Sequence, residues 1–427
     1  MGLTDIIRVE AIQSSTDQRH PAVQVTITTA KGAAGFGSVF ETYSTSRHRP
    51  KFLYDHTDHY QGFGVTTAVA IINQLIAPAL IGAAADNQSE VDGRIKEVMA
   101  KAKLEPYVNI SAPVSVAALK AGAASLDIPL YRHIGGRGAF AIPVGGQICA
   151  SGGKRYYAES RSRGRPVYNM VSYGFSNFAE AHYALWETTI AYEKLLAEKY
   201  SIRIHRGFSM AIPPGKLEND FKLWDILAEA VETAGYSGKI GIHVDVGADE
   251  YYQKETGLYK GLFSPEDKDK DAMLKIYEKM ASDYPFVIIQ DPLQQDDMDG
   301  HAALVGSTGV QITGRDLFGT NVSRIKQCIN AGCVNSVLFS LCSFNTVSDA
   351  IEVVRHAKNH GIDIMPQNLA GEGLDVAEYA VGFKAGTIYQ GGIDAVSNHL
   401  IAIEQAVGPR ARFYGMHGIQ GQRFRLQ

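Results

Sequence analysis

Polar side chains that could carry chemistry follow short apolar stretches in the C-terminal two thirds of the 427-residue sequence. Histidine and carboxylate groups can transfer protons, arginine can hold an anion, and amides and hydroxyls can orient a ligand. The ends of buried strands would bring such groups together. The residues that meet this description are His205, His243, Asp245, Gln290, Arg315, Ser340, Gln367, Asn368 and Tyr389.

His243 and Asp245 are two residues apart in an apolar stretch, so a strand there would place both side chains on one face. His243 would then lie one layer deeper than Asp245. It is either a buried histidine hydrogen-bonded to a neighbour or a group that handles protons. His205, at the end of the preceding apolar stretch, could meet it, and two histidines with one carboxylate are a ligand set for a transition metal.

A strongly basic stretch, KRYYAESRSRGR at 154–165, follows a pair of glycines. Its first two residues, Lys154 and Arg155, could cap an anionic substrate, and Lys154 could also handle protons. Basic residues interleaved with tyrosines could instead contact nucleic acid. We favour a third interpretation, a solvated loop. The glycine pair lacks the spacing of a phosphate-binding loop.

The pattern of apolar residues predicts two domains. Residues 7–30 alternate apolar and polar residues as two strands do, and residues 65–81 and 112–127 have helical spacing. These elements predict a small α+β unit that ends near a glycine-rich stretch at 135–138. We therefore expect an N-terminal domain over residues 1–138 and a C-terminal domain over residues 139–427.

The C-terminal domain reads as short strands alternating with helices, which favours a parallel β/α barrel with its chemistry at the carboxyl ends of the strands. A doubly wound open sheet is the alternative, but no glycine-rich nucleotide loop supports it. The predicted strands are 166–172, 201–205, 239–246, 286–290, 310–314, 335–340, 362–366 and 385–389. The predicted helices include 178–199, 221–234, 271–283, 323–331, 346–359 and 373–383.

Composition excludes several classes of protein. With 45% hydrophobic and 20% charged residues, the chain is neither disordered nor fibrous. A net charge of −4 and a pI near 6.4 give no attraction to nucleic acid or to a membrane surface. The four cysteines form no CxxC pair, and neither a signal peptide nor a membrane-spanning run is visible, so we expect a cytoplasmic protein.

Several stretches are similar to the enolase family over nearly the whole chain. They include IAPALIG at 76–82, KAGAASLDIPLYRHIGG at 120–136, YPFVIIQDPLQQDD at 284–297 and GVQITGRDLFGTN at 309–321. The resemblance implies an N-terminal α+β capping domain followed by a parallel β/α (TIM-type) barrel, usually assembled as a homodimer. It also implies dehydration of 2-phosphoglycerate by a lysine base, a glutamate acid and Mg²⁺ ions.

The family's catalytic residues are mostly replaced. Of its three metal-binding carboxylates, the resemblance places one at Asp245, while Gln290 and Arg315 stand at the other two positions. A guanidinium would repel a dication, so we expect no Mg²⁺ at this place and no other cofactor. Ser340 and Tyr389 stand where the family has lysines. The family's phosphate-holding His-Arg-Ser is replaced by the uncharged residues 368–370.

Arg315 is the most informative of these replacements. Its guanidinium could hold a carboxylate or phosphate through two hydrogen bonds without any metal ion. It could equally pair with Asp245, which would satisfy both buried charges and close the site.

Three functional hypotheses follow. The first, which we favour, is a diverged lyase-like enzyme acting on a small anionic carboxylate or phospho-acid. The second is a non-catalytic pseudo-enolase that binds a partner, and the third is a phosphopyruvate hydratase with ligands from other positions. In the first, protons would be handled by His205, His243, Asp245 or Lys154. The substrate would be bound by Arg315, Gln290, Arg155, Gln367, Asn368, Ser340 and Tyr389.

Overall fold

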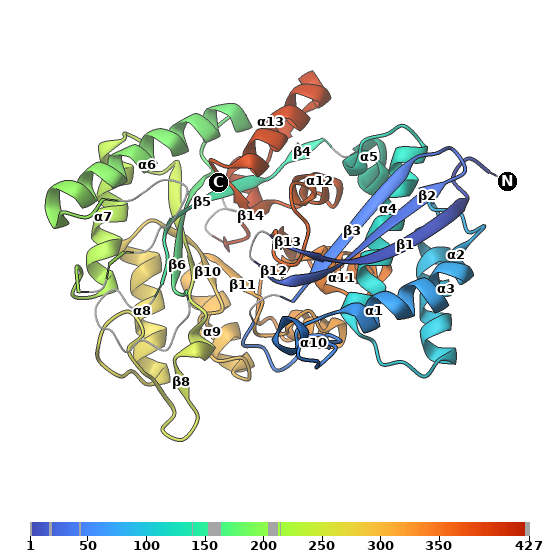
Figure 1. Ribbon diagram of the computed structural model, residues 1–427. Coiled ribbons are helices and arrows are strands. Elements are labelled where there is room, and N and C mark those ends of the chain that lie inside the picture. The colour runs from blue at the N-terminus through green and yellow to red at the C-terminus, as the bar shows by residue number, and fades with distance from the viewer. Residues whose placement is uncertain are drawn as a thin grey trace.

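The computed structural model describes residues 2–16, 19–41, 44–138, 140–152, 164–203, 212, 213 and 215–422. It has an N-terminal part built on a three-stranded sheet and a larger part built on an eight-stranded sheet (Figure 1). No helix of the described residues is both long enough and apolar enough to cross a membrane.

The N-terminal sheet is an antiparallel meander of β1 (Ile6–Ser15), β2 (Pro21–Thr29) and β3 (Ala34–Phe40). The two strands expected over 7–30 are confirmed, whereas β3 was not predicted. The two expected helices are also confirmed. The helices of this part are α1 (Thr66–Ile71), α2 (Ala77–Leu80), α3 (Gln88–Lys101), α4 (Val108–Ser125) and α5 (Leu130–Gly135).

Two glycines of β3 allow α4 to lie directly on the sheet. A Cβ atom on Gly35 would lie 2.1 Å from the carbonyl oxygen of Ala117, and one on Gly37 would lie 2.0 Å from that of Pro113. Neither oxygen can move away, because both belong to the backbone of a helix. Glycine is therefore required at these two positions of β3, because any side chain there would overlap the backbone of α4.

The large sheet forms a nearly closed barrel with the strand order β13-β12-β11-β10-β7-β6-β5-β14, in which β13 and β14 lie beside each other. The fold class expected from the sequence is confirmed. Only β6 runs antiparallel to its neighbours among the eight described strands. The strands are β5 (Val144–Ala150), β6 (Val167–Ser172), β7 (Ile240–Asp245), β10 (Phe286–Gln290), β11 (Gln311–Gly314), β12 (Ser336–Phe339), β13 (Asp363–Pro366) and β14 (Thr387–Gly391).

Seven of the eight predicted barrel strands are confirmed by these bounds. The strand predicted at 201–205 is wrong for residues 201–203, which lie in no strand, and its remaining residues are outside the described ranges. The eighth strand of the barrel is β5, which pairs with β6 as a hairpin before α6, the first helix of the barrel. Short strand pairs outside the barrel are β4 (Ala141–Ile142) with β15 (Arg412–Phe413), and β8 (Tyr252–Gln253) with β9 (Leu258–Tyr259).

Helices pack around the barrel and bury its outer face (Figure 1). Most of them begin at an Asn, Asp or Thr whose side chain accepts a hydrogen bond from a backbone N–H of the first turn, as Asn177 and Asp269 do. The six predicted helices are confirmed. The helices are α6 (Phe178–Tyr200), α7 (Asp220–Thr233), α8 (Lys270–Asp283), α9 (Met298–Thr308), α10 (Val322–Asn330), α11 (Val347–Asn359), α12 (Asp375–Gly382) and α13 (Ala395–Val407).

Replacement of Gly37 by alanine tests the contact between β3 and α4. Because the added Cβ would overlap the carbonyl oxygen of Pro113, we expect Gly37→Ala to lower the free energy of unfolding by about 2 kcal/mol or more. Gly306→Ala is the matched control, since Gly306 lies in α9 with open space around its Cβ position, and it should stabilise the protein by about 0.5–1 kcal/mol. Urea unfolding of both variants measures the difference. Equal effects would contradict the contact.

Candidate functional site

The carboxyl ends of three neighbouring strands bring the predicted polar residues together. In the ladder, Gln290 at the end of β10 is paired with Asp245 at the end of β7 and with Thr313 of β11. Arg315 and Asp316 follow β11 directly and come to the same end of the barrel. The prediction that chemistry-bearing residues collect at the strand ends is therefore confirmed for this side of the barrel mouth.

A second arginine lies among these residues. The Nε atom of Arg165 is 3.2 Å from Oδ1 of Asp245, its Nη1 is 3.7 Å from Oε1 of Glu250, and Nη1 also donates to Asp316. The four side chains are at most 6% exposed. Burial opposes the positive charge of Arg165, but the surrounding carboxylates raise its pKa, so the guanidinium is ionised.

Two local features position Arg165. Its carbonyl oxygen accepts a hydrogen bond of 2.6 Å from the hydroxyl of Tyr251. Its side chain passes over Gly247, where a Cβ atom would lie 2.1 Å from Cδ of the arginine. Gly247 also has a φ of +55°, so both its conformation and its surroundings require glycine.

These contacts correct two predictions. Asp245 pairs with Arg165 and not with Arg315, so the alternative in which Arg315 and Asp245 close the site is wrong. The solvated loop that we favoured for residues 154–165 is wrong at its last residue, because Arg165 is only 5% exposed. Lys154 and Arg155 are outside the described residues.

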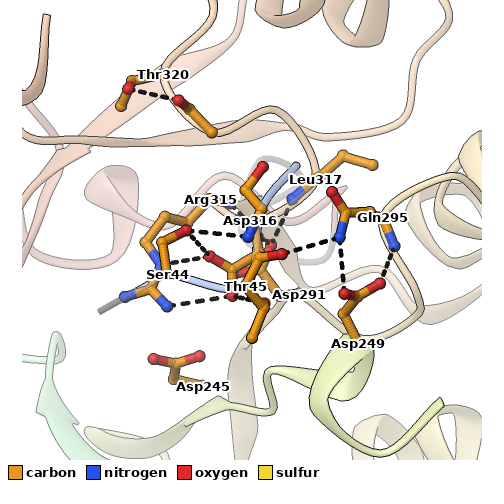
Figure 2. Close-up of polar contacts among 12 residues, drawn as sticks. Ser44, Thr45, Asp245, Asp249, Asp291, Gln295, Arg315, Asp316, Leu317 and Thr320 are labelled. Atoms are coloured by element: carbon orange, nitrogen blue, oxygen red, sulfur yellow. Dashed lines mark hydrogen bonds and ion pairs between the residues drawn. The ribbon is translucent and has the colours of Figure 1, made fainter. Parts of the chain in front are cut away.

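Asp316 holds the two parts of the molecule together at the site. The hydroxyls of Ser44 and Thr45, which follow the N-terminal sheet, each donate to its carboxylate at 3.0 Å (Figure 2). Arg315 donates to the same carboxylate from Nε at 3.1 Å and from Nη2 at 3.2 Å. With Arg165 as a further donor, every oxygen of Asp316 is satisfied.

Asp291 fixes the turn that carries Arg315. One oxygen of its carboxylate accepts hydrogen bonds from the backbone N–H groups of Arg315, Asp316 and Leu317 at 2.8, 3.0 and 3.4 Å (Figure 2). Three converging donors hold this backbone in place and therefore set the direction of the Arg315 side chain.

Six buried charged residues thus lie together at the barrel mouth, and we call them the mouth cluster: Arg165, Asp245, Glu250, Asp291, Arg315 and Asp316.

The mouth cluster contains four carboxylates and two guanidinium groups. Ionisation of all four carboxylates in this buried place is costly, because each charge loses its hydration there. Burial raises the pKa of Asp245 to about 7, with Arg165 acting in the opposite direction and Asp316 and Glu250 adding to the rise. Burial and Asp316 also raise the pKa of Asp291. Asp245 can therefore take up or release a proton near neutral pH.

His243 and Gln290 lie deeper in the barrel than Asp245. Nδ1 of His243 is 3.4 Å from the amide nitrogen of Asn169, and its ring meets the edge of Tyr389 at 5.2 Å between centroids. Tyr389 donates to Asp245 over 3.5 Å. Burial lowers the pKa of His243 to about 3, so the ring is neutral. Neither Nε2 of His243 nor the amide of Gln290 has a hydrogen-bond partner among the described residues.

The other predicted residues belong to a different side of the barrel mouth. Ser340 donates to the buried carboxylate of Glu372 at 2.6 Å. Asn368 is exposed, and its side-chain oxygen accepts the N–H of Gly373. Gln367 is buried, and its side-chain oxygen has no hydrogen-bond partner among the described residues. Ser340 is therefore a hydrogen-bonded residue at the rim of the barrel. His205 is outside the described residues, so the transition-metal hypothesis is untested.

The residues of the site do not fit Mg²⁺. Asp245, the carboxylate that the resemblance assigns to the metal, already pairs with Arg165, and a second guanidinium stands at Arg315. Two fixed cations would repel a dication at this place. Within the described ranges, no three His, Cys, Asp or Glu side chains are grouped so as to hold a metal ion.

The fold and the site define a two-domain protein with a β/α barrel and a charged cluster at its mouth. Residues 4–134 match the family model of the enolase N-terminal domain, and residues 169–422 match that of the enolase C-terminal TIM barrel domain. The chain belongs to the enolase family.

Relatives of the chain cover almost its whole length. The sequence is 32% identical over 421 residues to the enolase of Methanopyrus kandleri, a match covering 96% of this chain and 97% of that protein. It is 33% identical over 422 residues to the enolase of Bifidobacterium animalis subsp. lactis, covering 95% and 96%. For the enolase of Methanococcus aeolicus the identity is 30% over 418 residues, covering 95% and 96%.

Replacement of Arg165 tests whether its positive charge compensates the buried carboxylates of the mouth cluster. Arg165→Met leaves buried carboxylates without their shared cation, so we expect the free energy of unfolding to fall by about 3–5 kcal/mol. Arg47→Met is the matched control, because Arg47 pairs with Asp296 while 56% of its side chain is exposed. That variant should lose less than about 1 kcal/mol. Similar losses in the two variants, measured by chemical denaturation, would contradict the assigned role.

Replacement of Asp245 by asparagine tests its raised pKa. The folded protein binds this proton more tightly than the unfolded chain, so ionisation of Asp245 destabilises the fold as pH rises from about 4 to about 7. Asparagine has no such charge. We expect the stability of Asp245→Asn relative to wild type to increase by about 2 kcal/mol between pH 5 and pH 8. Urea unfolding at the two pH values measures it, and parallel pH dependences would disprove the shift.

Proposed function

We propose that the chain is a diverged member of the enolase family that acts as a lyase on a small carboxylate without the family's Mg²⁺ chemistry. The observation that carries the proposal is the guanidinium of Arg165 between the carboxylates of Asp245 and Asp316. A fixed cation thus lies among the residues where the family resemblance places a metal ion. Arg315 is the substrate-binding residue of the proposal.

The proposed reaction is an elimination next to a carboxylate. A C–H bond beside the substrate carboxylate breaks, the proton leaves, a C=C bond forms, and a leaving group departs from the neighbouring carbon. The guanidinium group of Arg315 would stabilise the negative charge that builds up on the carboxylate. Asp245, whose pKa is raised to about 7, is the group of the cluster suited to carry the proton.

A second candidate is a non-catalytic protein that binds a carboxylate and does not transform it. The saturation of Asp316 by four side chains favours it, because a buried carboxylate whose two oxygens are both hydrogen-bonded within the chain has the character of a structural element. The burial of Asp245, at 3% exposure, favours it too.

The homodimer and the cytoplasmic location remain predictions.

The first test is formation of phosphoenolpyruvate from 2-phosphoglycerate with saturating Mg²⁺, with an authentic enolase as control. We expect no product, because two of the three metal positions carry Gln290 and Arg315. Activity near that of the control would overturn both candidates in favour of phosphopyruvate hydratase.

The second test separates the lyase from the binding protein. Exchange of the C2 and C3 protons of small 2- and 3-hydroxy carboxylates with D₂O, followed by NMR, detects proton removal even without net reaction. We expect exchange that is lost in Asp245→Asn and retained in Arg47→Lys, which changes only an exposed pair. Binding without exchange would support the non-catalytic candidate.

A further inference from the structure

A cavity separates the N-terminal part from the barrel beside the mouth cluster. It encloses about 530 Å³ of space not filled by atoms, including the part open to solvent. Its walls come from the end of β3 and the following segment, and from the segments after β11, β12 and β13.

Arg315 supplies the cationic end of this cavity. Its side chain lines the cavity and is 93% buried, since the residue is 7% exposed. Nε and Nη2 donate to Asp316, whereas Nη1 has no hydrogen-bond partner among the described residues. A buried guanidinium with a donor left over is suited to a carboxylate, which can accept charge-assisted hydrogen bonds.

Much of the remaining lining is apolar. Val39 and Phe40 come from β3, Val108 begins α4, and Leu369 and Ala370 follow β13. A phosphate against these apolar side chains would lose its hydration without gaining a cation from them, which is unfavourable. An aliphatic group would gain free energy from burial at the same place.

The remaining charges of the cavity also disfavour a second anion. Glu41 lines the cavity, and its carboxylate already accepts from the hydroxyl of Tyr54 and pairs with Arg49 at 3.3 Å. The opposite charges of Glu41 and Arg49 therefore compensate each other. Arg315 is the buried cation of the cavity lining, whereas half of the Arg49 side chain is exposed to solvent.

We propose that the cavity binds a monocarboxylate with an aliphatic side chain, its carboxylate on Arg315 and its chain against the wall of Val39, Val108 and Leu369. The inference rests on the proposed function, because it takes Arg315 as the substrate-binding residue, and it narrows the substrate class. On this proposal a phosphorylated acid binds less tightly than the aliphatic acid.

The test measures binding by isothermal titration calorimetry of pyruvate, 4-methyl-2-oxopentanoate and phosphoenolpyruvate to the wild-type protein. The branched chain adds three carbons to pyruvate, so we expect at least about tenfold tighter binding of 4-methyl-2-oxopentanoate than of pyruvate. Phosphoenolpyruvate should bind no more tightly than pyruvate.

Leu369→Arg is the matching variant, because it places a guanidinium on the apolar wall. It should weaken binding of 4-methyl-2-oxopentanoate at least about tenfold and tighten binding of phosphoenolpyruvate. Leu369→Met, which keeps the wall apolar, should preserve the wild-type order. Leu369 is partly exposed, so both proteins are expected to fold, and the ligand series on wild type stands without them.

The possible outcomes distinguish failure of the proposed aliphatic ligand from failure of the proposed function. Tighter binding of phosphoenolpyruvate than of the branched acid, with loss of both in Arg315→Ala, would overturn the aliphatic substrate and leave the role of Arg315 intact. Binding of none of the three acids, or binding unchanged in Arg315→Ala, would overturn the proposed function together with the inference.

Discussion

The ion pairs of Arg165 are the interaction on which the rest of the site depends. Without this guanidinium, the buried carboxylates of Asp245 and Asp316 would lose a cation that lies in direct contact with both. Its presence decides several other properties at once. It makes the site unsuited to a dication, it keeps Asp245 from an even higher pKa, and it leaves Arg315 with a donor to spare. Gly247 and Tyr251 are explained by the need to hold Arg165 in place.

Much of the fold could be predicted from the sequence, because buried parallel strands are short apolar runs separated by helices. The exceptions have physical causes. β5 contains Gly145 and Gly146 and ends in small residues, so its apolar pattern is weak. The segment expected as a strand at 201–205 reads SIRIH and begins at Ser201, the left-handed residue that ends α6. β3 is glycine-rich because a helix lies against it.

The site was predicted in part. Residues at the ends of parallel strands, such as Asp245 and Arg315, could be found because strand direction fixes where they lie. Arg165 could not, because it precedes its strand. β6 runs antiparallel, with Val167 opposite Asp245, so the beginning of this strand lies where the other strands end. A signal was present: Arg165 and Pro166 stand directly before an apolar run, at the place where an antiparallel strand would enter the mouth.

Helix α4 shows that the two parts of the molecule share one interior. All its residues are buried except Lys120 and Ala124, since one side contacts the N-terminal sheet and the other contacts the barrel. Lys120 pairs with Asp375 of α12. Because α4 is buried on every side, an N-terminal part expressed without the barrel would expose to water the side of α4 that now contacts the barrel. The capping part is therefore a layer of the barrel protein and not a module that could be exchanged among scaffolds.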